Sequence, residues 1–239
     1  EADDSASPFE SAVDKAYRRA IRESGITLDN PAQIVQLVKA ITEKYIKTLD
    51  SKAIRGFFAN FNGAKVLPML QQSKSLWALL AGINQAVDMN AIINSIDGDV
   101  LLSVPAYSAD GMQISMAAQL SGAGFLADVD YWKKSVPKGT TLTDWQKNAY
   151  RFKGDGMSYC FGVTEGSKPE LYSGSSEAQA LASLQPSSSP LSPELQKLIN
   201  GKRIAFVVGI SSLLPEGAGM GTLMLPQLIK LKTIVYTVK

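Results

Sequence analysis

The carboxylates are the side chains of this chain that could carry acid–base chemistry. The sequence contains no histidine and a single cysteine, Cys160. This excludes Ser–His–Asp triads, Cys–His pairs and the common zinc sites. Glycoside hydrolysis would instead need two carboxyl groups roughly 5 to 10 Å apart at one cleft. Four acidic residues lie beside predicted turns and are the candidates, namely Asp97, Asp99, Glu165 and Glu170.

The turn positions of these carboxylates also fit a structural role. Asp97 and Asp99 flank Gly98 at a predicted helix-to-strand junction, and Asp side chains in turns commonly bond to neighbouring backbone amides. Calcium binding by the same pair is not favoured, because no regular series of oxygen ligands follows it. We expect neither a metal site nor a cofactor in this chain.

A glycine-rich run near the C-terminus is a second place where chemistry could occur. Gly217, Gly219 and Gly221 precede a predicted helix over residues 222–229, so backbone amides could converge on an anion. The spacing fits neither the dinucleotide-binding pattern nor the phosphate-loop pattern. A plain connection between two buried elements is the other interpretation.

Two further motifs favour structure over catalysis. Ser135 and Lys138 have the S-x-x-K spacing of serine acylases, but Pro137 lies between them at a predicted helix end. Cys160 has no nearby histidine to activate it and is expected to be a small buried residue. On the opposite face of the same predicted hairpin lie four aromatic side chains that we assign to the core, namely Tyr150, Phe152, Tyr159 and Phe161.

Composition narrows the possible functions further. The chain has 239 residues, 24 basic and 22 acidic, with 45% hydrophobic residues. The near balance of charge, without a basic cluster, argues against nucleic acid as a partner. The longest strongly apolar stretch, residues 204–214, is too short to span a bilayer. Because the chain begins with Glu1, we expect a mature form or an excised part of a longer protein.

Helical spacing of apolar residues dominates the first hundred residues. The patterns predict helices over residues 8–24, 31–49, 51–61 and 73–87, with a further turn at 90–96. Ser7 and Asn30 are suitable N-caps, each followed by a proline in the first helical position. Residues 1–96 are therefore predicted to form a mainly helical part.

From Asp97 onward the apolar period changes from 3.6 to 2. Predicted strands cover 100–107, 112–120, 149–153, 157–164, a short piece at 171–172, 202–211 and 231–238, and predicted helices cover 124–135, 177–184 and 192–199. Pro105 suggests that the first strand lies near an edge or carries a bulge, whereas 202–211 is apolar on both sides and is expected to be interior. The serine-rich segment 173–192 is interpreted as a surface loop with one short helix.

These patterns together predict an α+β fold. We expect N-terminal helices packed on a mostly antiparallel sheet of five or more strands with helical insertions. The whole chain, residues 1–239, is predicted to form a single domain, with residues 97–239 as its sheet-forming part.

The segment 86–100, AVDMNAIINSIDGDV, resembles a segment in a family of uncharacterised cell-envelope lipoproteins of Bacteroidetes-type bacteria. In that family a helix ends, a short N-x-I-x-x-I-x-G-D-V piece follows and a β-sheet begins. The resemblance implies that this chain is the C-terminal portion of an exported protein, with a lipid anchor outside this segment. It supplies no catalytic residues.

The leading prediction is a non-catalytic, cell-envelope-associated binding or assembly domain of unknown specificity, whose partners would be other envelope proteins or glycans. Two alternatives stay open. One is a carboxylate-dependent glycan or peptidoglycan hydrolase using two of the four candidate carboxylates or Asp110. The other is a carrier of a small anionic ligand at the 217–221 loop. Two carboxylates at one cleft would favour the hydrolase, and a pocket under the glycine loop would favour the carrier.

Overall fold

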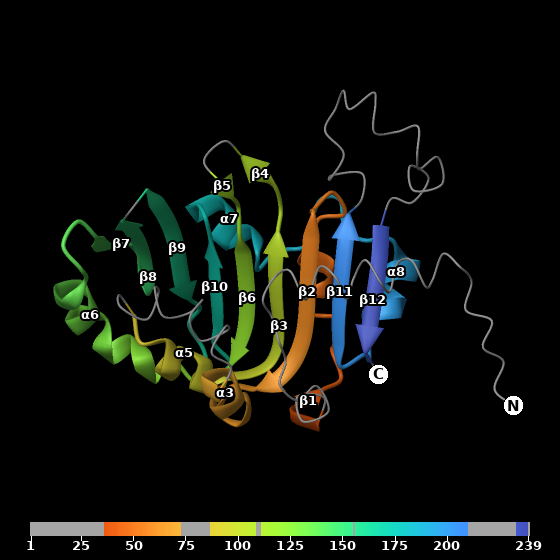
Figure 1. The fold of residues 1–239 in the computed structure, drawn as a ribbon, viewed down its shortest axis with the longest axis horizontal. Helices are drawn as coiled ribbons and strands as arrows, with labels where there is room; N and C mark the ends of the chain where they lie inside the picture. Colours follow the sequence, from red (N-terminus) through yellow and green to blue (C-terminus); the bar gives the residue numbers. More distant parts are fainter. Residues whose placement is uncertain (1–35, 73–86, 109–110, 155, 210–232, 239) are drawn as a thin grey trace, which may run out of the picture.

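A computed structural model describes residues 36–72, 87–108, 111–154, 156–209 and 233–238. Within these residues the chain forms a ten-stranded sheet in which every pair of neighbouring strands is antiparallel. The order across the sheet is β12-β11-β2-β3-β6-β10-β9-β8-β7, and the short strand β1 pairs with β2. The sheet is drawn face-on in Figure 1.

The strands are mostly five to nine residues long. Their bounds are β1 Val38–Lys39, β2 Arg55–Asn62, β3 Ile96–Val104, β6 Ser115–Leu120, β7 Thr141–Gln146, β8 Ala149–Gly154, β9 Met157–Val163, β10 Glu170–Gly174, β11 Ile204–Gly209 and β12 Thr233–Val238. A separate two-stranded hairpin pairs β4 Tyr107–Ser108 with β5 Gly111–Met112.

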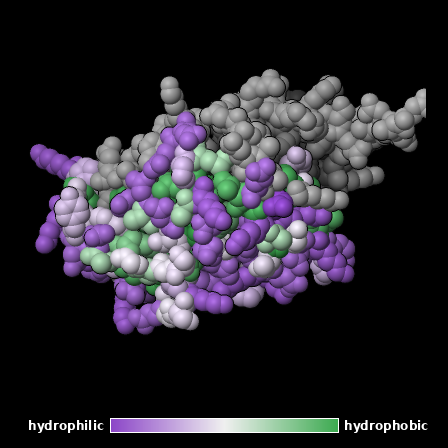
Figure 2. Space-filling model, turned by 90° about the horizontal axis from the view of Figure 1, so that it is seen from below, coloured by the Kyte–Doolittle hydropathy of each residue, from purple (hydrophilic) through white to green (hydrophobic). Residues whose placement is uncertain are grey.

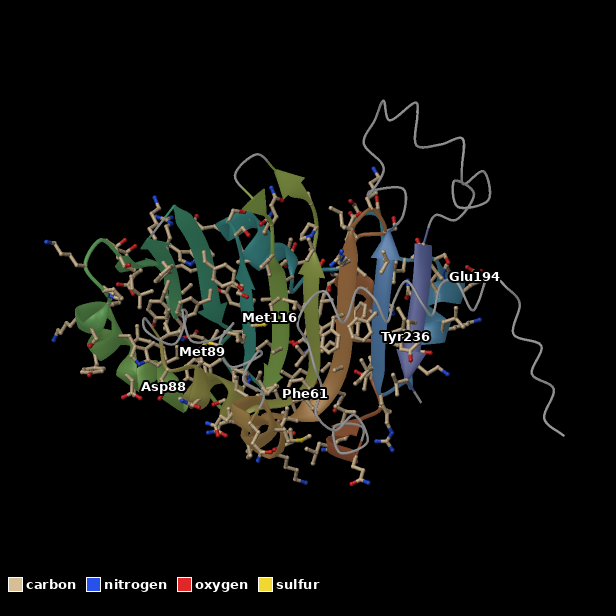
Figure 3. All side chains as sticks on the ribbon, viewed as in Figure 1. Phe61, Asp88, Met89, Met116, Glu194 and Tyr236 are labelled. Carbon is tan, nitrogen blue, oxygen red and sulfur yellow. The ribbon has the colours of Figure 1, made fainter. Side chains whose placement is uncertain are left out.

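The helices are short and lie between the strands. They are η1 Ile46–Thr48, α3 Gly63–Gln72, α5 Met89–Ser95, η2 Gly124–Asp128, α6 Val129–Ser135, α7 Glu177–Ala182 and α8 Pro193–Ile199. Figure 1 shows α7 and α8 behind the sheet and α3, α5 and α6 along its lower edge. The Asp88 side chain, labelled in Figure 3, begins α5 by accepting hydrogen bonds from the amides of Asn90 and Ala91.

Each face of the sheet has its own hydrophobic core. The first core joins strands β3, β6, β7, β8, β9 and β10 to α5, η2 and α6 through Ile92, Val100, Leu120, Phe125, Trp132, Tyr150, Phe161 and Leu171. Phe61 and Met116, labelled in Figure 3, pack against it and are partly buried. Apolar residues on alternate positions of these strands face this core, as the period of two requires.

The second core covers the opposite face. It joins β2, β3, β6 and β11 to the segment 41–53 and to α8 through Ile41, Tyr45, Ile46, Leu49, Phe58, Leu101, Leu191, Ile199 and Val207. Segment 47–51 is also tied to the loop after α7, since the amide of Ser187 donates to the Lys47 carbonyl and that of Ser51 to the Ser189 carbonyl. The covering layer on this face is therefore largely irregular chain.

The predicted arrangement with N-terminal helices is wrong. Residues 36–37 are helical, but within 38–49 the chain forms β1, a bend and η1 rather than the predicted helix. The apolar residues at helical spacing, Val38, Ile41, Tyr45 and Leu49, are indeed buried, but an irregular segment lying across the sheet buries them. Tertiary packing thus overrides the local periodicity.

The helix predicted over 51–61 is also wrong, because β2 occupies this stretch. Phe58 is buried in the second core and Phe61 packs against the first. A central strand with apolar residues on both faces shows no alternation, so its apolar run is easily mistaken for a helix. Among the described residues, α3 and all later helices follow this strand. The sheet dominates, and the α+β arrangement with N-terminal helices is not supported.

The antiparallel sheet itself is confirmed, as are the hairpin β8–β9 and the strands β10 and β12. The predicted edge position of the 100–107 strand is wrong: β3 lies between β2 and β6, and Pro105 follows its last residue, Val104. As predicted, β11 is interior, between β12 and β2. The helices predicted over 8–24 and 73–87 lie outside the described residues, apart from Val87.

The surface of the described part is predominantly hydrophilic in the view of Figure 2, with hydrophobic residues showing between the polar ones in the middle of that face. Within the described ranges, no helix has the length and apolar character needed to cross a membrane.

Candidate functional site

A row of polar side chains crosses four strands on the second face of the sheet. Asn60 of β2 is the register partner of Asp99 of β3, and Gln119 of β6 is the partner of Glu170 of β10. The two pairs are joined where the Asp99 amide donates to Gln119 Oε1 at 2.8 Å. The fold therefore brings two of the sequence candidates, Asp99 and Glu170, onto one face.

Asp99 is almost completely buried, with 1% exposure. Its Oδ1 accepts hydrogen bonds from Asn60 Nδ2 at 2.8 Å and from the Thr42 amide at 3.2 Å, and its Oδ2 accepts one from the Thr42 hydroxyl. These donors compensate the loss of hydration that burial of a carboxylate causes. They also attach the irregular segment around Thr42 to the sheet, so the carboxylate is occupied by the fold.

Gly98 allows Asp99 to reach this position. It has φ +134° at a register shift between β3 and β6, and an added Cβ would meet the side chain of Gln119. Only glycine adopts this backbone conformation without strain. The Gly98–Asp99 step that resembled turn chemistry is thus a bulge that aims a carboxylate into the fold.

Glu170 is occupied in a similar way. Its Oε1 accepts a hydrogen bond from the Tyr45 hydroxyl at 2.7 Å and pairs with Lys44 Nζ at 2.8 Å. Burial of the ring, together with the hydrogen bond to Glu170, raises the pKa of Tyr45 well above its ordinary value. Tyr45 therefore stays protonated and holds the covering segment to β10.

The other two acidic candidates lie apart from this row. Asp97 is exposed and accepts a hydrogen bond from Asn62 Nδ2 at 3.3 Å, whereas exposed Glu165 pairs with Lys147. Asp110 and the three glycines of the predicted anion loop, Gly217, Gly219 and Gly221, lie outside the described residues.

The remaining motifs have structural positions. Ser135 is the last residue of α6 and its hydroxyl donates to the Tyr131 carbonyl, so the helix ends before Lys138. Cys160 is buried beside Ala149 and Tyr172. Tyr150 and Phe161 are in the first core, with their ring centroids 5.4 Å apart. Cys160 and the aromatic pair thus contribute to packing.

A cavity of about 320 Å³ opens on the same face, further along β3. It lies between β3, β6, the segment 48–53 and the chain from α7 to the loop at 185–188. Its lining residues are Thr48, Asp50, Ala53, Leu101, Ser103, Pro105, Ser115, Gln179, Ala182, Ser183, Gln185, Pro186, Ser187 and Ser188. Asp99, Leu101 and Ser103 alternate along β3, so the polar row and the cavity share one face of this strand.

Sequence reasoning missed this cavity. All five lining serines and Gln179 lie in segments that carry no recognisable motif, and the serine-rich stretch 173–192 is predicted to be a surface loop with one short helix. The signal that could have suggested a site is the excess of hydroxyl side chains in that stretch. Only the tertiary fold brings the hydroxyls of this stretch next to Asp50 and to Ser103 of β3.

Within the part of the chain that the structure describes, no group of three or more Cys, Asp or Glu side chains could hold a metal ion. In comparisons with known proteins, no family model, curated protein or solved structure matches the chain. The resemblance of 86–100 to envelope lipoproteins therefore stays a prediction.

Proposed function

We propose that this chain is a non-catalytic binding domain of the bacterial cell envelope. The observation that carries the proposal is the composition of the cavity lining. Among the described residues that line it, Asp50 is the only carboxylate, and none is Lys, Arg or Cys. Two-carboxylate hydrolysis needs a second acid at the same cleft, whereas binding needs only shape and hydrogen-bonding groups.

The polar row supports the same proposal. Asp99 and Glu170 share a face, but Asp99 is buried under three donors and Glu170 is bonded to Tyr45 and Lys44. A general acid or base must reach the substrate proton directly or through one water. Carboxylates held in this way act as attachments within the fold.

The envelope location is a proposal that rests on the segment resembling the Bacteroidetes lipoproteins. That segment spans the junction from α5 into β3 and includes the Gly98–Asp99 bulge. In a cell that makes the full-length protein, fractionation followed by immunoblotting should recover it with the membranes and release it with detergent. Recovery in the soluble cytoplasmic fraction would contradict this location.

Turnover assays test the absence of catalysis. Purified protein is incubated with peptidoglycan and with soluble glycans, and newly formed reducing ends are measured against buffer. We expect no increase for the wild type. Release of reducing ends by the wild type that is lost in Asp50→Asn or Glu170→Gln would overturn the proposal and favour the hydrolase.

A further inference from the structure

Buried serines of two strands, β3 and β6, and of the C-terminus of α7 line the cavity. Ser103 and Ser115 are buried, and their hydroxyls make only long bonds to carbonyls, at 3.5 Å to Arg55 and 3.4 Å to Gln179. Buried Ser183 donates to the Ala180 carbonyl at 2.7 Å. A serine hydroxyl that donates once still has two lone pairs for accepting. These three serines can therefore donate hydrogen bonds to a ligand hydroxyl or accept them from it.

The side chain of Gln179 has an acceptor oxygen that forms no hydrogen bond within the described residues. Its amide nitrogen donates to Gln113 Oε1, but its own Oε1 is buried and has no hydrogen-bond partner among the described residues. A buried carbonyl without a partner costs about 1–3 kcal/mol. Gln179 lines the cavity, so a turn of its side chain that brings this oxygen to a ligand hydroxyl would recover that cost.

The electrostatic character of the cavity selects against anions. Its described lining residues contain one charged side chain, Asp50. The Asp50 oxygens accept hydrogen bonds from the Lys52 amide at 2.7 Å and from the Ser187 hydroxyl at 3.0 Å. These bonds keep the carboxylate in place beside the loop at 185–188. A second negative charge in the same space would be repelled, because no described residue of the lining is a cation that could offset it.

Apolar side chains complete the lining. Leu101 and Ala53 are buried in the second core and also border the cavity. A sugar ring matches this combination, since its C–H groups can pack on the apolar side chains and its hydroxyls can bond to the lining serines. The volume of about 320 Å³ is at the small end of ligand pockets, which fits a ligand of this size.

From these observations we infer that the cavity binds an uncharged, hydroxyl-rich molecule of sugar size. The ligand contacts the hydroxyls of Ser103, Ser115 and Ser183 and donates to Gln179 Oε1, while Asp50 disfavours anionic analogues. This inference rests on the proposed binding function and adds a place and a ligand class to it.

Calorimetric titration with two matched sugars tests the inference. Glucose and glucuronate share a pyranose ring and differ by one carboxylate. We expect glucose to bind the wild type and glucuronate to bind about tenfold more weakly, the effect of roughly 1.4 kcal/mol of charge repulsion. In Asp50→Asn the glucuronate penalty should shrink to about twofold or less.

A variant that blocks the mouth locates the site. Ala182 is exposed and lines the cavity, whereas its neighbour Leu181 is exposed and does not line it. Ala182→Trp should weaken glucose binding by at least about tenfold, and Leu181→Trp should leave it unchanged. Equal melting temperatures of the two variants show that both are folded.

The outcomes separate the inference from the proposed function. Absence of glucose binding, binding that survives Ala182→Trp, or glucuronate binding as tightly as glucose would each overturn the ligand assignment. None of these outcomes bears on turnover, which decides the proposed non-catalytic function by a different assay. Glucose binding lost only in Ala182→Trp, with the expected charge preference, supports the inference.

Discussion

Two polar regions on one face of β3 differ in what their side chains do. Around Asp99, the carboxylate has a full set of donors and connects the irregular segment near Thr42 to the sheet. Around Asp50, the buried hydroxyls of Ser103 and Ser115 make long bonds, and Gln179 Oε1 has no partner among the described residues. Asp99, a catalytic candidate in the sequence, therefore stabilises the fold. The serines near Asp50, which belong to no motif, keep hydrogen-bonding capacity for a ligand.

The largest expected effect comes from removing the buried carboxylate. Asp99→Ala leaves the buried Asn60 amide without an acceptor and removes both hydrogen bonds from Thr42, so it should lower the free energy of unfolding by about 3 kcal/mol. Asp97→Ala, two residues away and exposed, should cost less than about 0.5 kcal/mol. Urea denaturation followed by circular dichroism measures both. Equal losses would mean that Asp99 is not the attachment we describe.

A second test concerns the bulge that aims Asp99. Gly98→Ala places a Cβ at φ +134° and against Gln119, so it should destabilise the protein by about 2 kcal/mol. The control is Gly122→Ala, where an added Cβ meets nothing within 4 Å. Its stability should stay within about 0.5 kcal/mol of wild type. A Gly98 variant as stable as the Gly122 variant would contradict the role of the bulge.

Tyr45, which lies in the region around Asp99 and Glu170, makes the stability of the protein depend on pH. Tyr45→Phe removes the hydrogen bond to Glu170 and should cost about 1.5 kcal/mol at pH 7. Because the folded pKa is raised, the unfolded chain ionises first, near pH 10, and the tyrosine's contribution is present below that pH and falls above it. Between pH 10 and 11 the wild type should lose about 1 kcal/mol more than the variant.

Comparison with the variant is needed because burial also raises the pKa of Tyr150 and Tyr159. Those residues contribute equally to the alkaline loss in both proteins. Unfolding free energies from urea titrations at several pH values supply the two slopes. Parallel slopes for wild type and Tyr45→Phe would show that Tyr45 ionises as easily in the folded protein as in the unfolded chain.

The smallest effect on stability is expected from a substitution in the cavity lining near Asp50. Ser183→Ala removes one hydroxyl that donates to the Ala180 carbonyl and should cost about 1 kcal/mol or less. Ser95→Ala removes a similar bond within α5, to the Ala91 carbonyl, away from the cavity. Both variants should melt near the wild-type temperature, but only Ser183→Ala should weaken glucose binding. Equal glucose affinities would contradict a ligand role for Ser183.

The elements that the sequence predicts well are those with local signals. The hairpin β8–β9 follows from alternation around a glycine-containing turn, and α8 agrees with the helix predicted over 192–199, where the structure shows Ser192 as the N-cap. The stretches 38–49 and 51–61 were misassigned because their burial depends on distant partners. The β2 run is apolar on both faces, and Tyr45 is buried against a strand residue, Glu170, far along the chain.

The candidate site divides in the same way. The sequence identifies Asp99 and Glu170 as unusual, but their donors come from Thr42, Asn60 and Tyr45, and no local pattern links these residues. The cavity joins Asp50 to Ser187 across 137 positions of the chain. Motif spacing detects sites within one element, and both regions here are assembled from several.

One measurement compares the two regions in a single sample. In a ¹H–¹⁵N spectrum of the labelled protein titrated with glucose, we predict that the amide signals of Ser103, Ser115 and Ser183 shift with a common saturation curve. The amide signals of Asp99, Gln119 and Glu170 should stay in place. Shifts confined to the Asp99 row, or no shifts at any of these six amides, would contradict the assignment of one region to the fold and the other to a ligand.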